Sequence, residues 1–116
     1  MLVVDDHAGF RSVARLLLTT AGFDVVGEAA SGVDAISTSE RLRPDAVLLD
    51  VQLPDADGFE VSRRLAEQTH PPAVVLTSAL ALADYGVKVL PPDVRGFLAK
   101  AELSGTALTD VLDGSS

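Results

Sequence analysis

An apolar run that ends at Asp50 constrains the fold of this chain most. Residues 46–49 are Ala-Val-Leu-Leu, and the turn that follows Asp50 contains Pro54 and Gly58. A short, uninterrupted apolar run bounded by turn residues is typical of a fully buried strand. The sequence therefore predicts a carboxylate at the tip of a buried strand, where an unpaired charge is costly.

A second apolar run ends in the same way. Leu2-Val3-Val4 is followed directly by Asp5 and Asp6. If both runs are strands of one parallel sheet, their carboxyl ends lie at the same edge, so three carboxylates meet there. We expect a functional site at this edge.

Helical periodicity and turn residues divide the rest of the chain. Further strands are predicted at 23–26, 73–77 and 96–100, with a loop at 27–31. Helices are predicted over 8–21, from Ser31 to Pro44, from Asp57 or Gly58 onward, over 79–90 with an interruption at Gly86, and from Ser104 onward. The side chains expected to face the core are Phe10, Val13, Ala14 and Leu17 in the first helix, Val33, Ile36 and Leu42 in the second, Val61 and Leu65 in the third, and Leu108, Val111 and Leu112 in the last, with Arg11 and Arg15 turned away.

Five strands that alternate with five helices predict an α/β fold with a parallel sheet and helices on both faces. Sheets of this size commonly run in the order 2-1-3-4-5, and their ligands bind at the switch point between strands one and three. Those strands end in Asp5-Asp6 and Asp50. We expect residues 1–116 to form a single domain, since 116 residues can bury one core.

Composition excludes several classes of protein. The net charge is −8, with only nine lysines and arginines, so the chain has no basic surface for direct nucleic-acid binding. Cysteine is absent, which excludes disulfides and cysteine-based zinc sites. No apolar run approaches the roughly 18–20 residues of a membrane span. We expect a cytoplasmic protein without a membrane partner.

Carboxylates that meet at one edge require a positive partner. Two of them about 4 Å apart repel by roughly 4 kcal/mol at an effective dielectric constant near 20. Magnesium fits, because it prefers oxygen ligands, commonly uses one or two carboxylates and leaves positions for water and phosphate. Thr77 and Lys100 close strands four and five, so a hydroxyl and an ammonium reach the same edge and can contact a phosphoryl group there. A free oxygen of Asp50 could then attack phosphorus and form an acyl phosphate.

Four motifs along the chain resemble those of a known family. They are Val3-Val4-Asp5-Asp6-His7, Leu48-Leu49-Asp50-Val51-Gln52-Leu53-Pro54 with Asp57-Gly58, Val75-Leu76-Thr77-Ser78, and Gly96-Phe97-Leu98-Ala99-Lys100. This ordered set spans the chain and resembles the receiver domain of bacterial two-component response regulators, particularly those joined to helix-turn-helix output domains. The resemblance implies the flavodoxin-like fold of receiver domains.

The resemblance also implies a phosphorylation site that depends on Mg²⁺. Asp50 would accept a phosphoryl group from a histidine kinase or a phosphotransfer protein. Asp5, Asp6 and Asp50 would bind the metal ion together with the backbone carbonyl of Gln52. His7, directly after Asp6, is expected to be a helix-start residue and not a ligand.

A switch follows from the same resemblance. Thr77 and Lys100 would contact the phosphoryl group, and Thr77 together with Phe97 would switch a protein-interaction face made by helix 79–90, strand 96–100 and the last helix. That face would meet a downstream effector or an output domain, and it is a candidate homodimer interface. No output domain is expected within 1–116, so the chain either works alone or is a fragment of a longer regulator.

Two departures from the family pattern concern this face. Ala101 follows Lys100, where many receivers have proline, and a cis bond before Ala101 would cost about 2.5–4 kcal/mol. Pro91-Pro92 and Gly86 predict a short or irregular helix over 79–90.

Three alternatives remain from the sequence. A magnesium-dependent phosphohydrolase with an aspartyl nucleophile would usually have a second Asp where Gln52 stands, so we expect no enzyme activity beyond the chain's own phosphorylation and dephosphorylation. A flavin-binding module would need to hold phosphate at Asp5-Asp6-His7, where acid repels it. A receiver-like module that only binds partners is disfavoured by the presence of Asp6, Asp50, Thr77 and Lys100.

Overall fold

The fold is a five-stranded parallel sheet with helices on both faces. The computed structural model describes residues 1–80, 84 and 90–113. The strands are β1 (Leu2–Val4), β2 (Gly27–Ala29), β3 (Ala46–Asp50), β4 (Ala73–Ser78) and β5 (Gly96–Ala99), in the order β2-β1-β3-β4-β5. The helices are α1 (Ala8–Thr20), α2 (Gly32–Leu42), α3 (Gly58–Ala66) and α4 (Gly105–Leu112), and a short 3₁₀ helix covers Lys100–Glu102. The predicted fold class and strand order are confirmed.

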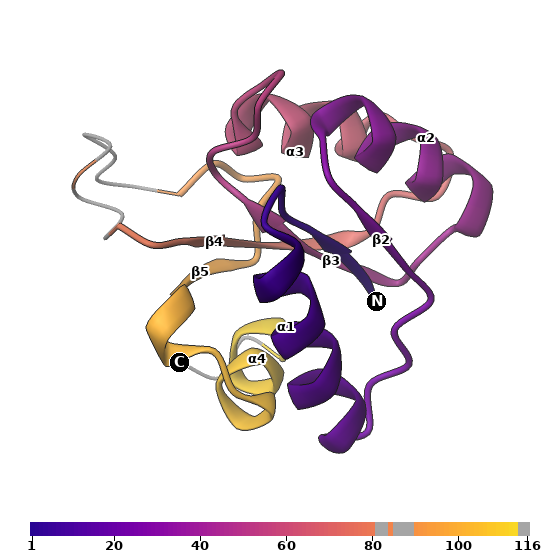
Figure 1. Ribbon diagram of the computed structural model, residues 1–116. Coiled ribbons are helices and arrows are strands. Elements are labelled where there is room, and N and C mark those ends of the chain that lie inside the picture. Colours follow the sequence, from indigo (N-terminus) through magenta and orange to yellow (C-terminus); the bar gives the residue numbers. More distant parts are fainter. Residues whose placement is uncertain (81–83, 85–89, 114–116) are drawn as a thin grey trace.

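Two hydrophobic cores lie on the two faces of the sheet. In Figure 1, α2 and α3 cover one face, while α1 and α4 cover the other. Alternate residues of each strand enter different cores: Leu49 packs on the α2/α3 face and Leu48 on the α1/α4 face. Because the central strand is buried on both faces, it is a continuous apolar run.

The predicted starts of three helices are confirmed by their caps. Ser31 and Ser104 accept hydrogen bonds through their hydroxyls from the backbone of Asp34 and Ala107. Asp57 accepts one from the backbone N–H of Glu60 at the start of α3. These caps satisfy helix N–H groups that have no partner within the helix.

The second strand was predicted in the wrong place. Residues 23–26 connect α1 to the sheet, and β2 begins at Gly27, which pairs with Leu2. Gly27 allows a close approach, because a Cβ there would lie 2.9 Å from Leu42. The strand Gly-Glu-Ala has weak intrinsic strand preference, so its pairing with β1 outweighs local propensity. The apolar residues Phe23, Val25 and Val26 therefore led to the wrong prediction.

Several inward faces were also predicted incorrectly. In α1 the buried residues are Ala14 and Leu18, whereas Val13 is 55% exposed and Leu17 39%. In α2 the buried residues are Gly32, Ala35 and Ser39, whereas Val33 is 69% exposed and Leu42 38%. Small side chains let α2 pack closely, so a search for large apolar residues misses its inner face. Ala14, Val61, Leu65 and Leu108 are buried as predicted. The other side chains that were predicted to face the core pack against it partly buried, namely Phe10, Ile36, Val111 and Leu112.

The remaining predictions on secondary structure have mixed outcomes. The helix predicted over 79–90 falls mainly outside the described residues. The peptide bond between Lys100 and Ala101 is trans, as are all others in the described part of the chain. No helix described here has both the length and the apolar character to cross a bilayer.

Candidate functional site

Four polar side chains lie on one face of the sheet at the carboxyl ends of its strands. Asp50 is directly opposite Thr77 in the β3–β4 register. Residues 48, 75 and 98 point into the α1/α4 core, so the alternation of side chains places Asp50, Thr77 and Lys100 on that same face. Asp5 follows β1 and lies two residues after Val3, which also faces this core, so the two side chains point to the same face of the sheet. The predicted meeting of strand ends is therefore confirmed.

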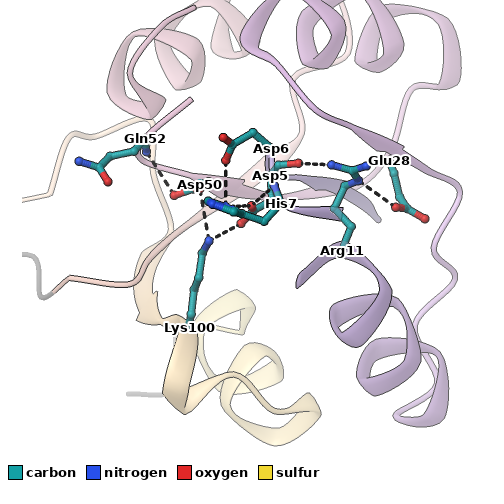
Figure 2. A network of polar contacts seen from close by, with 8 residues as sticks. All are labelled: Asp5, Asp6, His7, Arg11, Glu28, Asp50, Gln52 and Lys100. Atoms are coloured by element: carbon teal, nitrogen blue, oxygen red, sulfur yellow. Dashed lines mark hydrogen bonds and ion pairs between the residues drawn. The ribbon is translucent and has the colours of Figure 1, made fainter. Parts of the chain in front are cut away.

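Lys100 connects the two buried carboxylates. Its Nζ lies 2.6 Å from Oδ2 of Asp5 and 3.4 Å from Oδ2 of Asp50, as Figure 2 shows. The ammonium also stacks over the ring of Phe10, 4.6 Å from its centroid. Burial alone would lower the pKa of Lys100, but the hydrogen bond and charge of Asp5 and the charge of Asp50 outweigh it and raise the pKa. Lys100 is therefore held in its charged form.

Asp50 is buried at the bottom of the site, with 3% of its surface exposed. Burial raises the pKa of this carboxyl, and the hydrogen bond from the backbone N–H of Gln52 opposes the rise. The charge of Asp5 raises the pKa further, while Lys100 lowers it. The ionised carboxylate thus exists in the folded chain at a cost in free energy.

Asp5, Asp6 and His7 form a turn between β1 and α1. Oδ1 of Asp5 accepts a hydrogen bond from the backbone N–H of His7 at 2.8 Å. Nδ1 of His7 lies 3.1 Å from Oδ1 of Asp5 and 3.0 Å from Oδ1 of Asp6. His7 occupies the N-cap position of α1, as expected of a helix-start residue, although its side chain makes no capping hydrogen bond. Its ring instead contacts both carboxylates.

The donor set fits a hard divalent cation. Ligand atoms of Asp5, Asp6, His7 and Asp50 all lie within 4.8 Å of one another. Three carboxylates and one ammonium leave two formal negative charges, which a divalent ion would balance. Carboxylate oxygens are ligands that Mg²⁺ prefers. Asp5, Asp6 and Asp50 could therefore hold such an ion.

The site opens to solvent through a shallow cavity. Its volume is about 230 Å³, and Asp6, Asp50, Gln52, Ala79 and Lys100 are among the residues that line it. Behind these residues, the hydroxyl of Thr77, whose residue pairs with Asp50 in register, is fully buried and has no hydrogen-bond partner among the described residues. A buried hydroxyl without a hydrogen-bond partner is costly, and a ligand that accepts its hydrogen bond would remove this cost. The site therefore presents a carboxylate, an ammonium and a free hydroxyl donor to a small anionic group.

Comparison with known proteins assigns the family. The model of the response regulator receiver domain matches residues 1–112. The chain belongs to the response regulator receiver family. It is therefore a receiver domain of the kind found in two-component response regulators.

Similar proteins include enzymes and transcription regulators. The chain is 39% identical over 84 residues to a protein-glutamate methylesterase/protein-glutamine glutaminase from Hahella chejuensis, which covers 72% of this chain and 24% of that protein. It is 34% identical over 102 residues to a putative transcriptional regulator from Pseudomonas aeruginosa, covering 88% of this chain and 49% of that protein. The solved receiver domain of the putative regulator NarL from Mycobacterium tuberculosis superposes with a TM-score of 0.77 at 30% identity, covering 97% of this chain and 94% of that one. This receiver thus spans less than half of the length of the methylesterase and of the transcriptional regulator from Pseudomonas aeruginosa.

Phe97 lies apart from the other predicted site residues of the receiver. It pairs in register with Leu76 and packs, half-buried, against the core on the α2/α3 face. Thr77 and Lys100 lie on the opposite face. The sheet itself therefore separates Phe97 from the acidic site, and its switching role stays a prediction.

The loop after Asp50 is held against the strand by a glycine. A Cβ at Gly58 would lie 2.6 Å from the carbonyl oxygen of Asp50 and 2.8 Å from Cα of Val51. The backbone N–H of Gly58 donates to the carbonyl of Val51 at 2.7 Å. The backbone N–H of Gln52 reaches Asp50, whereas the predicted metal contact of its carbonyl stays a prediction.

Arg11 lies beside the receiver site, although the sequence pattern predicted that it turns away. Its Nη1 donates to the backbone carbonyl of Asp5 at 2.6 Å, and its Nε donates to Glu28 at 3.1 Å (Figure 2). Arg15 also pairs with Glu28, at 2.8 Å. Both arginines were expected to turn away, because the position of Glu28 in β2 was not predicted.

Proposed function

We propose that this receiver domain is a phosphorylation switch in which Asp50 accepts a phosphoryl group from a phosphohistidine. The observation that carries the proposal is the combination at the carboxyl edge of the sheet: a buried Asp50 carboxylate, the ammonium of Lys100 and the unpaired hydroxyl of Thr77, which pairs with Asp50 in register. Such a set complements the charge and the acceptor oxygens of a phosphoryl group. The donor would be a histidine kinase or a phosphotransfer protein in the cytoplasm.

The proposed transfer forms one bond and breaks one. An oxygen of ionised Asp50 attacks phosphorus, the P–O bond forms and the P–N bond of the phosphohistidine breaks. The histidine nitrogen keeps the electron pair of the P–N bond. We propose no enzymatic activity beyond this transfer and the later hydrolysis of the acyl phosphate.

Lys100 and Thr77 have distinct roles in this proposal. The ammonium of Lys100 already lies between Asp5 and Asp50, so it needs to move little to pair with a phosphoryl oxygen on Asp50. The hydroxyl of Thr77 donates a hydrogen bond to the same group and thereby gains the partner that it lacks. Both contacts exist only in the phosphorylated state, so they stabilise it selectively.

Asp5, Asp6 and Asp50 are proposed to hold Mg²⁺ with the backbone carbonyl of Gln52. The three carboxylates bring ligand atoms within 4.8 Å of one another at the cavity. A bound Mg²⁺ would offset the negative charge that accumulates as an anionic phosphoryl group approaches Asp50. Without a cation, the two uncompensated charges of the site would repel that group.

The phosphoryl group is proposed to act on a protein-interaction face. It adds a charge of about −1.5 to −2 and three acceptor oxygens at Asp50. Movement of Thr77 toward these oxygens would change the packing at the end of β4, beside Phe97 in β5. The face formed by β5 and α4 would then favour an effector, an output domain or a second copy of the chain.

The test is the intact mass of the chain after incubation with Mg²⁺ and acetyl phosphate, compared with an Asp50→Asn variant. The proposal predicts one phosphoryl adduct that requires Mg²⁺ and is absent from the variant. An adduct of equal yield in the variant, or one that forms equally in excess EDTA, would contradict it.

A further inference from the structure

The loop between β3 and α3 is tied to a distant helix by Asp55. Its Oδ1 accepts a hydrogen bond from the backbone N–H of Gly32 at 2.7 Å, and its Oδ2 accepts one from Val33 at 3.0 Å. These N–H groups belong to the first turn of α2, more than 20 residues away in sequence. The hydrogen bond from Gly32, with that from Val33, lowers the pKa of Asp55, so the bridge is anionic at neutral pH.

The packing beneath this bridge is equally close. A Cβ at Gly32 would lie 3.0 Å from Val61, 3.2 Å from Ala56 and 3.3 Å from Oδ1 of Asp55. Glycine at the start of α2 therefore allows the helix to rest directly on the loop. Two independent features, the paired hydrogen bonds and the glycine contact, fix the loop against α2.

The tethered loop is short and internally bonded. The backbone N–H of Leu53 donates to the carbonyl of Ala56 at 3.2 Å, and Gln52 pairs with Asp57 in an antiparallel bridge. At the other end of the loop, the N–H of Gln52 donates to Oδ1 of Asp50. Asp55 therefore lies three residues from Gln52 in a loop that is hydrogen-bonded internally and reaches Asp50 at its other end.

We infer that Asp55 is a positioning residue for the metal site: by anchoring the loop to α2, it holds Gln52 in place beside Asp50 and so sets the affinity for Mg²⁺. This inference rests on the proposed function, because it assumes that the loop contributes to the metal site. Outer-sphere partners that orient metal ligands typically change affinity by about 10–100-fold. Asp55 would act on Gln52 through the intervening loop and not by direct contact, so we expect a change in Mg²⁺ affinity near the lower limit, about tenfold.

A simple capping role for Asp55 makes a different prediction. Ser31 caps the same helix end, where its hydroxyl accepts a hydrogen bond from the backbone N–H of Asp34 at 3.2 Å, a bond that lies within the start of α2 and does not involve the loop. Ser31→Ala is therefore a matched control, since it weakens the start of α2 and leaves the tether in place. Asp55→Asn keeps an acceptor oxygen for one of the two N–H groups and is the conservative variant.

The experiment is a calorimetric Mg²⁺ titration of the whole chain and of the Asp55→Ala, Asp55→Asn and Ser31→Ala variants. We expect Kd to rise about tenfold in Asp55→Ala, to rise less in Asp55→Asn, and to change by less than twofold in Ser31→Ala. Equal affinities in the wild type and Asp55→Ala would overturn the inference, and so would an equal loss in Ser31→Ala. If the wild type itself binds no Mg²⁺, the proposed metal site fails, and the inference fails with it.

A second measurement does not depend on the folding of a variant. In the wild-type chain, the amide NMR signals of Gly32 and Val33 should shift with the same Mg²⁺ midpoint as the signal of Gln52. Signals of Gly32 and Val33 that stay unchanged while Gln52 responds would overturn the inference without touching the proposed function.

Discussion

Replacement of Lys100 by methionine should destabilise the domain strongly in the absence of Mg²⁺. Methionine keeps much of the apolar length of the side chain but removes the charge that lies 2.6 Å from Asp5 and 3.4 Å from Asp50. Asp5 and Asp50 then face each other with ligand oxygens within 4.8 Å. At an effective dielectric constant near 20, their repulsion is at least about 3.5 kcal/mol.

The expected loss in the free energy of unfolding is about 3 kcal/mol. Removal of one partner from a buried ion pair costs about 3–5 kcal/mol, and Lys100 lies at the lower limit because 17% of its side chain is exposed. The assay is urea denaturation at pH 7 with EDTA present, followed by far-UV circular dichroism. Arg64→Met is the control, because its pair with Glu60 at 3.8 Å lies on the surface, where such a pair contributes less than about 0.5 kcal/mol.

Two further measurements link this loss to repulsion between carboxylates. The double variant Lys100→Met with Asp5→Asn should recover much of the lost stability, because only one acidic group of the pair stays charged. Saturating Mg²⁺ should also restore stability to Lys100→Met. A loss below about 1 kcal/mol in Lys100→Met, or a double variant that is less stable than Lys100→Met, would refute this account of the site.

Three other perturbations test the same structure. Burial raises the pKa of Asp50, so between the unfolded-state and folded-state pKa values the folded chain keeps a proton that the unfolded chain has released. The free energy of unfolding therefore falls as pH rises from 3.8 through the folded-state pKa. Asp50→Asn should remove this decline and raise the free energy of unfolding at pH 7 in urea titrations. Gly58→Ala should lower the free energy of unfolding by about 1–3 kcal/mol, because the added Cβ clashes with the backbone. Gly9→Ala, in open space on α1, should raise it by about 0.5–1 kcal/mol. Thermal unfolding of both variants measures the difference. In urea denaturation, Leu49→Ala in the core should lower the free energy of unfolding by about 2–5 kcal/mol. Leu16→Ala on the exposed surface should lower it by less than about 0.5 kcal/mol. Equal losses would contradict the assignment of Leu49 to the core.

The acidic site could be predicted from the sequence because each residue directly follows or ends an apolar run. Asp5 and Asp50 mark the ends of β1 and β3, and the parallel arrangement brings those ends to one edge. Thr77 and Lys100 follow from the same rule. In such a sheet, the position of a side chain along its strand determines its place in the site.

The contacts that hold the site in place could not be predicted in this way. The hydrogen bond between Asp55 and the backbone of Gly32 forms only if α2 lies close to the loop, and the sequence does not specify that distance. Arg11 reaches the carbonyl of Asp5 while its Nε donates to Glu28, which lies in the short edge strand β2 that the sequence pattern did not predict. Such contacts depend on tertiary pairing, which outweighs the local pattern of residues.

The most direct test of the proposed switch is the chemical location of the phosphoryl group. The chain would be phosphorylated with acetyl phosphate and Mg²⁺ and then treated with borohydride, which reduces a phosphorylated aspartate to homoserine, and its peptides would be sequenced by mass spectrometry. We predict homoserine at position 50 and unchanged aspartate at positions 5 and 6. A phosphorylated chain in which Asp50 stays intact, with the phosphoryl group on His7 or another residue, would contradict the assignment of Asp50 as the acceptor.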